Sequence, residues 1–160
     1  MKVCAAVMMV VSTVWVGAAE KKIWAESFMG RKAPEVVVEE WISAEPKTKG
    51  KWVLVDFWAT WCGPCVEGIP HLNEFHKEFG DKMVVIGISQ QKRSTVERMK
   101  KPTMDYYHGV SPGMATYKAL GVKGIPHVVI IDPEGVVRWE GFPLLPGFKL
   151  TREVVAGLLD

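Results

Sequence analysis

The stretch of residues 53–65 constrains the fold most, because an apolar segment there runs straight into a Cys-x-x-Cys turn. The segment is apolar apart from Asp56, which is typical of a central strand covered by helices on both faces. Cys62 and Cys65 follow with Pro64 between them, and proline is favoured in the first turn of a helix. We therefore expect a buried strand, then a helix whose N-terminus lies beside Cys62.

The rest of the chain alternates strand and helix patterns. Apolar residues at helical spacing follow the cysteines as far as residue 79, with Pro70 expected to kink the helix, and a buried strand follows at 83–89. Strand, helix and strand in that order predict a parallel βαβ unit with a right-handed crossover. The other expected elements are a short strand at 36–38, a helix at 93–101, an extended piece at 104–108, a helix at 114–120, antiparallel strands at 127–131 and 136–140, and a helix at 151–159.

Residues 1–19 differ in kind from the rest of the chain. One positive charge precedes a nearly unbroken apolar run, and the small residues 17–19 precede the first charged cluster. This order is typical of a secretory signal peptide, with cleavage expected after Ala19. The alternative is an uncleaved membrane anchor, although a full span normally needs about 20 apolar residues. We expect an exported, periplasmic or otherwise extracytoplasmic protein with one domain over residues 20–160.

Composition and cysteine count narrow the function. Hydrophobic residues make up 48% and charged residues 24% of 160 residues, as in an ordinary single domain, and a net charge of +2 does not predict nucleic acid as a partner. Cys4 falls in the expected signal, so only Cys62 and Cys65 remain. A structural zinc site usually needs four ligands, and a disulfide across so small a loop stabilises little. We therefore expect redox exchange between the two thiols, without metal or cofactor.

The positions of the two cysteines predict different roles. Cys62 should face the unpaired N–H groups and the positive end of the helix, which lowers a thiol pKa to roughly 3.5–7.5 from about 8.5. Cys65 should lie inside the first turn, where the helix shields it. Cys62 is then the attacking sulfur, and Cys65 resolves the mixed disulfide.

These motifs resemble a known family. Val-Asp-Phe-Trp-Ala-x-Trp-Cys-Gly-Pro-Cys over residues 55–65 resembles the active-site stretch of thioredoxins, and Pro70 matches their kink proline. The signal-like segment, the Gly-Lys at 50–51, and the strand at 85–89 with an extra helix and extended piece after it look more like the exported TlpA/ResA branch. The resemblance covers residues 33–160. It implies an α/β thioredoxin fold, a central mixed sheet flanked by helices, with a small insertion after the second core strand.

The resemblance also implies site residues. Gly124-Ile125-Pro126 resembles the loop in which the family holds a cis proline against the dithiol, so Pro126 should be cis and Ile125 should offer backbone groups to a substrate. Trp61, with Gly63 and Pro64, should contact the substrate.

Asp56 is implied to lie beneath Cys65 and to pass protons to it. Burial in the strand should raise the pKa of Asp56. The alternative is a carboxylate that merely hydrogen-bonds to backbone at the end of a strand.

Some residues depart from the family pattern or allow two readings. Gly68 stands where the TlpA/ResA branch often carries glutamate, Glu67 precedes it on another helix face, and Val66 stands where thioredoxins commonly have lysine. A second active-site carboxylate is therefore in question.

Two further residues each allow two interpretations. Trp58 flanks the dithiol or packs in the core, and His127 tunes the thiolate or is a hydrogen-bonded strand histidine.

The sequence thus predicts a thiol-disulfide oxidoreductase that acts on protein dithiols and disulfides. Gly63-Pro64 resembles the reducing thioredoxins, which favours a reductant. We expect a monomer, and the resemblance implies a membrane-associated electron donor and a client in cytochrome c maturation or disulfide repair. Two alternatives stay open: a non-enzymatic binding module with a static disulfide, and a thiol peroxidase, although Thr60 lies only two residues before Cys62 and so misses the Thr-x-x-Cys spacing.

Overall fold

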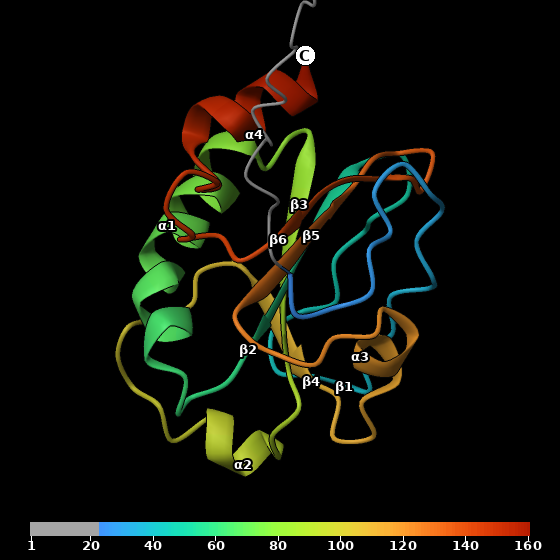
Figure 1. Ribbon diagram of the computed structural model, residues 1–160. Coiled ribbons are helices and arrows are strands. Elements are labelled where there is room, and N and C mark those ends of the chain that lie inside the picture. Colours follow the sequence, from blue (N-terminus) through green and yellow to red (C-terminus); the bar gives the residue numbers. More distant parts are fainter. Residues whose placement is uncertain (1–22) are drawn as a thin grey trace, which may run out of the picture.

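The central strand of the fold is β2 (Trp52–Trp58), the apolar stretch ahead of the cysteines. The computed structural model describes residues 23–160, and Figure 1 shows its single mixed sheet. β2 pairs in parallel with β3 (Met83–Ser89) and antiparallel with β5 (His127–Ile131). The sheet order is β1-β4-β3-β2-β5-β6, and its other strands are β1 (Glu40–Trp41), β4 (Tyr107–Val110) and β6 (Val137–Gly141).

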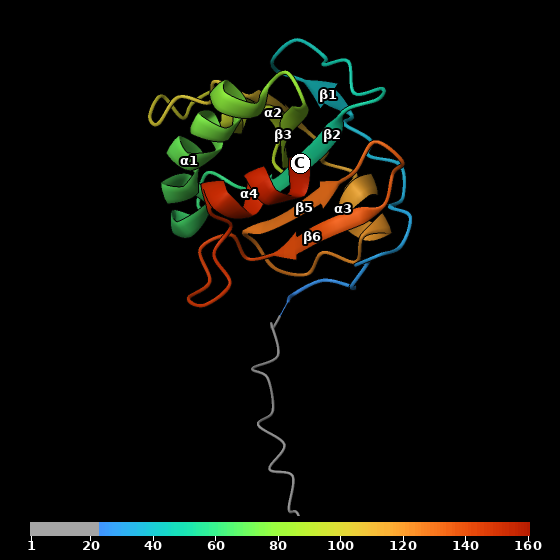
Figure 2. The ribbon, with the colours of Figure 1, turned by 90° about the horizontal axis from the view of Figure 1, so that it is seen from above.

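Helices cover both faces of this sheet. α1 (Gly63–Phe79) and α4 (Arg152–Leu159) pack on one face, and α3 (Ala115–Ala119) packs on the other, as Figures 1 and 2 show. α1 connects β2 to the parallel strand β3, so the predicted βαβ unit is confirmed. The predicted thioredoxin-like architecture, a mixed sheet between helices, is therefore the one observed.

The two faces of β2 are both buried, as its sequence predicts. Leu54 and Trp58 belong to the core beneath α1 and α4, whereas Val55 and Phe57 belong to the core beneath α3. Side chains alternate between the faces of a strand, so Asp56 shares its face with Leu54 and Trp58. The carboxyl group therefore points to the side of the sheet that carries the cysteines.

The predicted strand at 36–38 is wrong, and the edge strand lies later, at β1. β1 pairs with β4 through residues 40 and 41. The backbone N–H of Val37 donates to the hydroxyl oxygen of Thr116, and the carbonyl of Val37 accepts from the hydroxyls of Thr116 and Ser111. Because side-chain hydroxyls satisfy this backbone, it needs no neighbouring strand.

The prediction for residues 93–108 is also wrong in its boundaries. The helix α2 (Arg93–Val96) is one turn long, and the following strand begins at Tyr107 rather than at residue 104. Pro102 disfavours helical backbone in the residue before it. Asn73 of α1 then holds the backbone of residues 103–105 in place, so tertiary contacts shape this segment.

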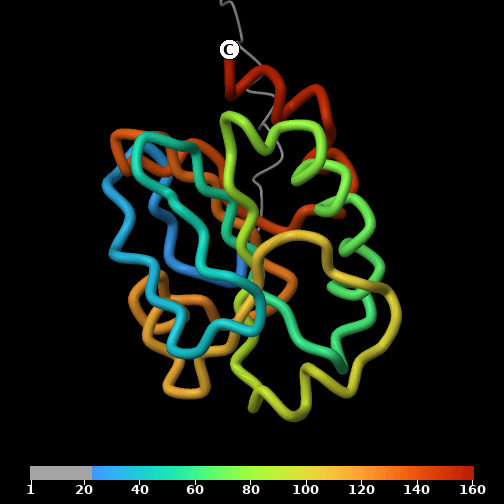
Figure 3. The backbone as a smooth tube through the Cα atoms, turned by 180° about the vertical axis from the view of Figure 1, so that it is seen from behind, coloured from blue at the N-terminus to red at the C-terminus, as the bar shows by residue number. Residues whose placement is uncertain are grey.

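The remaining elements agree with the sequence. β5 and β6 form the predicted antiparallel pair, joined by a turn over residues 132–135 in which Gly135 takes a φ of +82°. The predicted α3 and α4 are present, and Thr151 caps α4 by accepting a hydrogen bond from the N–H of Val154. Figure 3 shows the segment before β1 running along the sheet beside the chain near β6.

The predicted signal peptide or anchor at residues 1–19 lies outside the described residues. Among residues 23–160, no helix combines the length and apolar character required to cross a membrane.

Candidate active site

The dithiol sits at the start of α1, where the sequence predicts it. Cys62 is the N-cap of the helix, with extended backbone, and its carbonyl accepts from the N–H of Val66 at 3.0 Å. Pro64 occupies the first turn, which holds no acidic side chain. No side chain caps this N-terminus, so its N–H groups remain available to a thiolate on Cys62.

Cys62 and Cys65 form a disulfide with a Cα–Cα distance of 5.2 Å. Cys65 is 3% exposed, as expected for a sulfur shielded by the first helical turn, and Cys62 is itself only 5% exposed. Trp61, next to them, is 65% exposed and forms an aromatic rim at the site. Trp61 is therefore exposed beside two sulfurs that are themselves almost fully buried.

The loop before β5 closes the site from the opposite side. The peptide bond between Ile125 and Pro126 is cis, as predicted. Pro126 lines the same cavity as Pro64 and Cys65, and Ile125 is half-buried beside it. Segments more than 50 residues apart in the chain thus meet at the dithiol.

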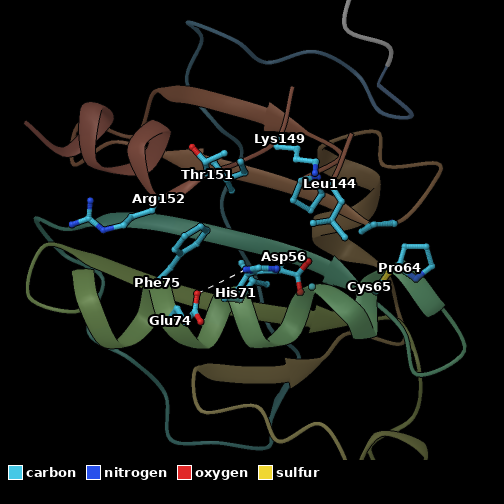
Figure 4. Close-up of a pocket in the computed structure, with 15 residues that line it drawn as sticks. Asp56, Pro64, Cys65, His71, Glu74, Phe75, Leu144, Lys149, Thr151 and Arg152 are labelled. Carbon is cyan, nitrogen blue, oxygen red and sulfur yellow. Dashed lines mark ion pairs between the residues drawn. The ribbon is translucent and has the colours of Figure 1, made fainter. Parts of the chain in front are cut away.

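A cavity of about 310 Å³ extends from Cys65 along α1 to the start of α4. Figure 4 shows Asp56 and Cys65 towards one end and Glu74 and Arg152 towards the other. Gly68 lines the cavity, and a Cβ placed on it would meet no atom within 4 Å. The lack of a side chain at this position therefore leaves the approach to Cys65 and Asp56 open.

Asp56 is a buried carboxyl group on the floor of this cavity. It is 2% exposed, and the hydroxyl of Tyr106 donates to its Oδ2 at 3.4 Å. Burial raises the pKa of Asp56 from 3.8 to about 7, although the hydrogen bond from Tyr106 lowers it. The predicted direction is confirmed, and a group that titrates near pH 7 can both take and give a proton at physiological pH.

Two residues near the site carry no signal in the sequence. Tyr106 is one of them, because nothing in its local pattern points to Asp56. Gln91 is the other: its Oε1 accepts from the N–H of Thr60 at 2.7 Å, and its Nε2 donates to the hydroxyl of Thr60 at 3.0 Å. Gln91 therefore holds the loop that carries Trp61 to the dithiol.

The position of each residue in the fold tests the two interpretations that the sequence allowed for it. Trp58 is fully buried in the same cluster as both cysteines, so it is core and also packs near the dithiol. His127 is buried against the ring of Phe57, on the sheet face opposite to the dithiol. Glu67 is exposed and does not line the cavity, so it is not a second carboxylate at the site.

The cavity has a charged outer end. His71 and Glu74 form an exposed ion pair at 3.8 Å, and Arg152 pairs with Glu78. Within residues 23–160, no three His, Cys, Asp or Glu side chains gather closely enough to hold a metal ion.

Comparison with known proteins agrees with this geometry. Residues 29–140 match the model of the AhpC/TSA family. The chain is 30% identical over 117 residues to the thioredoxin-like protein YneN of Bacillus subtilis, a match that covers 68% of each chain. It is 28% identical over 118 residues to the thiol-disulfide oxidoreductase ResA of Bacillus thuringiensis, which covers 70% of this chain and 68% of ResA.

A solved structure supports the fold. A putative thiol:disulfide interchange protein DsbE from Chlorobium tepidum superposes with a TM-score of 0.68 at 24% identity, over 82% of this chain and 98% of that one. The family match covers more than half of the chain, and the matched range holds the dithiol, Asp56 and the cis proline. The chain therefore belongs to the AhpC/TSA family, as one of its thioredoxin-like thiol-disulfide oxidoreductases.

Proposed function

We propose that this protein is an exported reductant that transfers two electrons from its dithiol to a disulfide of another protein. The observation that supports this most is the placement of Cys65 and Asp56, whose pKa is about 7, on one open cavity at the N-terminus of α1. The expectation of export rests on the composition of residues 1–19.

The first step uses Cys62. In the reduced protein, its thiolate is stabilised by the N–H groups of α1 and attacks one sulfur of the client disulfide. A bond forms between Cys62 and that sulfur, the client disulfide breaks, and the other client sulfur leaves as a thiolate that takes a proton from water. The exposed ring of Trp61 and the backbone beside Pro126 hold the client at this stage.

The second step uses Cys65 and Asp56. The carboxylate takes the proton from the thiol of Cys65, and the resulting thiolate attacks the sulfur of Cys62. The bond between Cys62 and the client breaks, the Cys62–Cys65 disulfide forms, and the client leaves as a thiolate that takes the proton from Asp56. Overall the client gains two electrons and two protons, one proton from water and one from Cys65 by way of Asp56. This protein loses two electrons and the proton of Cys65.

The charge of Asp56 supports the reducing direction. A carboxylate beside the dithiol raises the free energy of a nearby thiolate, because like charges repel in a buried site. The reduced protein is then less favoured, and it gives up electrons more readily. A second dithiol protein, proposed to be membrane-associated, must return these electrons.

Trapping of clients tests the two cysteine roles. Cys65→Ser should accumulate a client in mixed disulfide with Cys62, because the resolving sulfur is missing. Cys62→Ser is the matched control, since it also removes one thiol and should trap nothing. The adducts are counted on non-reducing gels and identified by sequencing. Equal trapping by both variants would contradict the assigned roles.

The reduction potential tests the direction of transfer. Equilibration with a dithiol of known potential should place the protein near the reducing thioredoxins, at about −270 mV, and not near the oxidant DsbA, at about −120 mV. A potential above about −150 mV would overturn the proposed direction. A disulfide whose reduction potential lies below about −300 mV would indicate a static bond. Peroxide consumption that survives in Cys65→Ser would instead favour a thiol peroxidase.

A further inference from the structure

We propose that Tyr106 is a positioning residue of the dithiol reaction, whose hydroxyl keeps Asp56 as a carboxylate ready to take the proton of Cys65. The inference rests on the proposed role of Asp56 as the base in the second step. It gives a function to the insertion between β3 and β4, because that segment delivers Tyr106 to the floor of the active site.

Both partners of the hydrogen bond between Tyr106 and Asp56 are buried. Tyr106 is 1% exposed, and its hydroxyl donates to Oδ2 of Asp56 at 3.4 Å. Among the described residues, it is the only side chain that hydrogen-bonds to this carboxyl group. A hydrogen bond donated to the charged form favours that form, so Tyr106 opposes the effect of burial.

The chain holds Tyr106 in place through α1, the helix that also carries the cysteines. The side-chain amide of Asn73 donates to the carbonyl of Thr103 at 2.9 Å, and its oxygen accepts from the N–H of Asp105 at 2.8 Å. These two bonds clamp the backbone directly before Tyr106. The position of the tyrosine is thereby tied to the helix that sets the position of Cys65.

β3 leaves room for the tyrosine ring. Gly87 is the register partner of Asp56 in the parallel pair of β2 and β3. A Cβ on Gly87 would lie 2.8 Å from Cε of Met104 and 3.0 Å from Cε2 of Tyr106, closer than packed carbons approach. Because Gly87 has no side chain, Met104 and Tyr106 of the insertion can pack in the space beside Asp56.

Other groups around Asp56 do not replace Tyr106. Tyr117 lies on α3, and its hydroxyl donates to the carbonyls of Ile88 and Trp58 instead. Burial and then the nearby charge of Asp56 raise the pKa of Tyr117, so it stays neutral. The titratable and charged groups that face Asp56 across the cavity lie on its exposed side, where water screens them: His71, Glu74, Lys149 and Arg152.

Tyr106→Phe removes the hydroxyl and keeps the ring, and Tyr117→Phe makes the same change at the neighbouring tyrosine as a matched control. The titration midpoint of Asp56 is read from its carboxyl carbon by NMR in the oxidised protein. Loss of the hydrogen bond should raise that midpoint by about one pH unit in Tyr106→Phe. The midpoint should stay at its wild-type value in Tyr117→Phe.

The kinetic readout is the reaction of the reduced protein with 5,5′-dithiobis(2-nitrobenzoate). The first nitrothiobenzoate released reports the attack of Cys62, and the second reports the attack of Cys65. At pH 7, Tyr106→Phe should slow the second release by about five-fold, because a smaller fraction of Asp56 is ionised, and the rate should recover at higher pH. The first release and the rates of Tyr117→Phe should remain as in the wild type.

The outcomes separate this inference from the proposed function. Suppose that Tyr106→Phe keeps the wild-type midpoint of Asp56 and the wild-type pH profile of the second release, while Asp56→Asn alters that profile. This result would overturn the role of Tyr106 but not that of Asp56. An unchanged second release in Asp56→Asn would overturn the proposed base and, with it, this inference. Asn73→Ala provides a second route if Tyr106→Phe folds poorly: loosening the clamp should shift the midpoint in the same direction, and an unshifted midpoint would count against the proposal.

Discussion

A single buried carboxyl group links the chemistry of this protein to its stability. Asp56 has a pKa of about 7 in the folded protein, because burial disfavours its charged form. Between about pH 4 and pH 7 the folded state therefore keeps a proton that the unfolded state releases. The contribution of Asp56 to stability is greatest below this window and is lost as the pH rises through it, so the carboxylate that we propose acts in exchange is destabilising.

Asp56→Asn should remove this pH dependence. The variant should be more stable than the wild type at pH 8, by an amount on the order of 2 to 4 kcal/mol, with little difference at pH 4. Urea unfolding of the oxidised proteins at the two pH values measures this difference. A wild-type slope of stability against pH in the variant would contradict the assignment.

A second buried carboxyl group provides a control of opposite sign. Burial acts to raise the pKa of Asp132, but hydrogen bonds from the N–H of Val136 and from Arg138 outweigh it, so this pKa is lowered. Asp132→Asn should therefore lose stability at neutral pH, where Asp56→Asn gains it.

At the scale of the element, α1 organises the site. It presents Cys62 at its N-terminus and shields Cys65 in its first turn. Further along the helix, the side chain of Asn73 hydrogen-bonds to the backbone of the insertion. Gly68 on the same helix leaves the cavity open. One rigid helix thus fixes the relative positions of the sulfurs, the cavity and the segment that delivers Tyr106.

Gly68→Glu should place a second carboxylate in this cavity. The position has room for a side chain, and replacing glycine in a helix interior favours the helix by up to about 1 kcal/mol. Two nearby carboxylates disfavour each other's ionisation, so the pKa of Asp56 should rise further above 7. NMR titration of Asp56 measures the shift, and the second release in the nitrothiobenzoate assay should slow at pH 7.

Gly68→Gln is the matched control for this prediction. It has nearly the same size and shape as glutamate and carries no charge. Equal midpoints of Asp56 in the two variants would show that volume, and not charge, decides the effect.

At the scale of the whole molecule, the segment before β1 is bound to the far edge of the sheet. The N–H of Phe28 donates to Oε2 of Glu140 at 2.8 Å, and the hydroxyl of Ser27 donates to its Oε1. Backbone bonds from Gly30 and Ala33 to the chain around β6 continue this contact. The buried Glu140 thus joins residues 27–33 to the core at a place remote in sequence.

Glu140→Ala should release this segment without altering the chemistry. The free energy of unfolding should fall by about 1 to 3 kcal/mol, because the partly buried N–H of Phe28 loses its acceptor. Amide hydrogen exchange over residues 27–33 should accelerate, whereas the reduction potential should stay unchanged. Exchange at the wild-type rate in this segment would contradict the role of Glu140, and Glu140→Gln should restore part of the protection.

The elements that were predicted correctly share one property: their signals are local. β2 and α1 follow from apolar periodicity and from Pro64 beside the cysteines, and the β5–β6 turn follows from its aspartate, proline and single glycine. The raised pKa of Asp56 was also predictable, because a lone carboxyl group in an apolar strand must be desolvated. The cis bond before Pro126 was predictable only through family resemblance.

The sequence by itself thus determined the dithiol, the helix that begins at it, and the carboxyl group in the strand below, because each depends on neighbours within one strand or one helical turn. Only the tertiary structure decided that Tyr106 reaches Asp56, that Gln91 holds the loop of Trp61, and that residues 36–38 remain outside the sheet. In each case a side chain satisfies a buried polar group or a backbone from a distant part of the chain. Such pairings depend on which surfaces the packed core brings together, and no local pattern of residues encodes them.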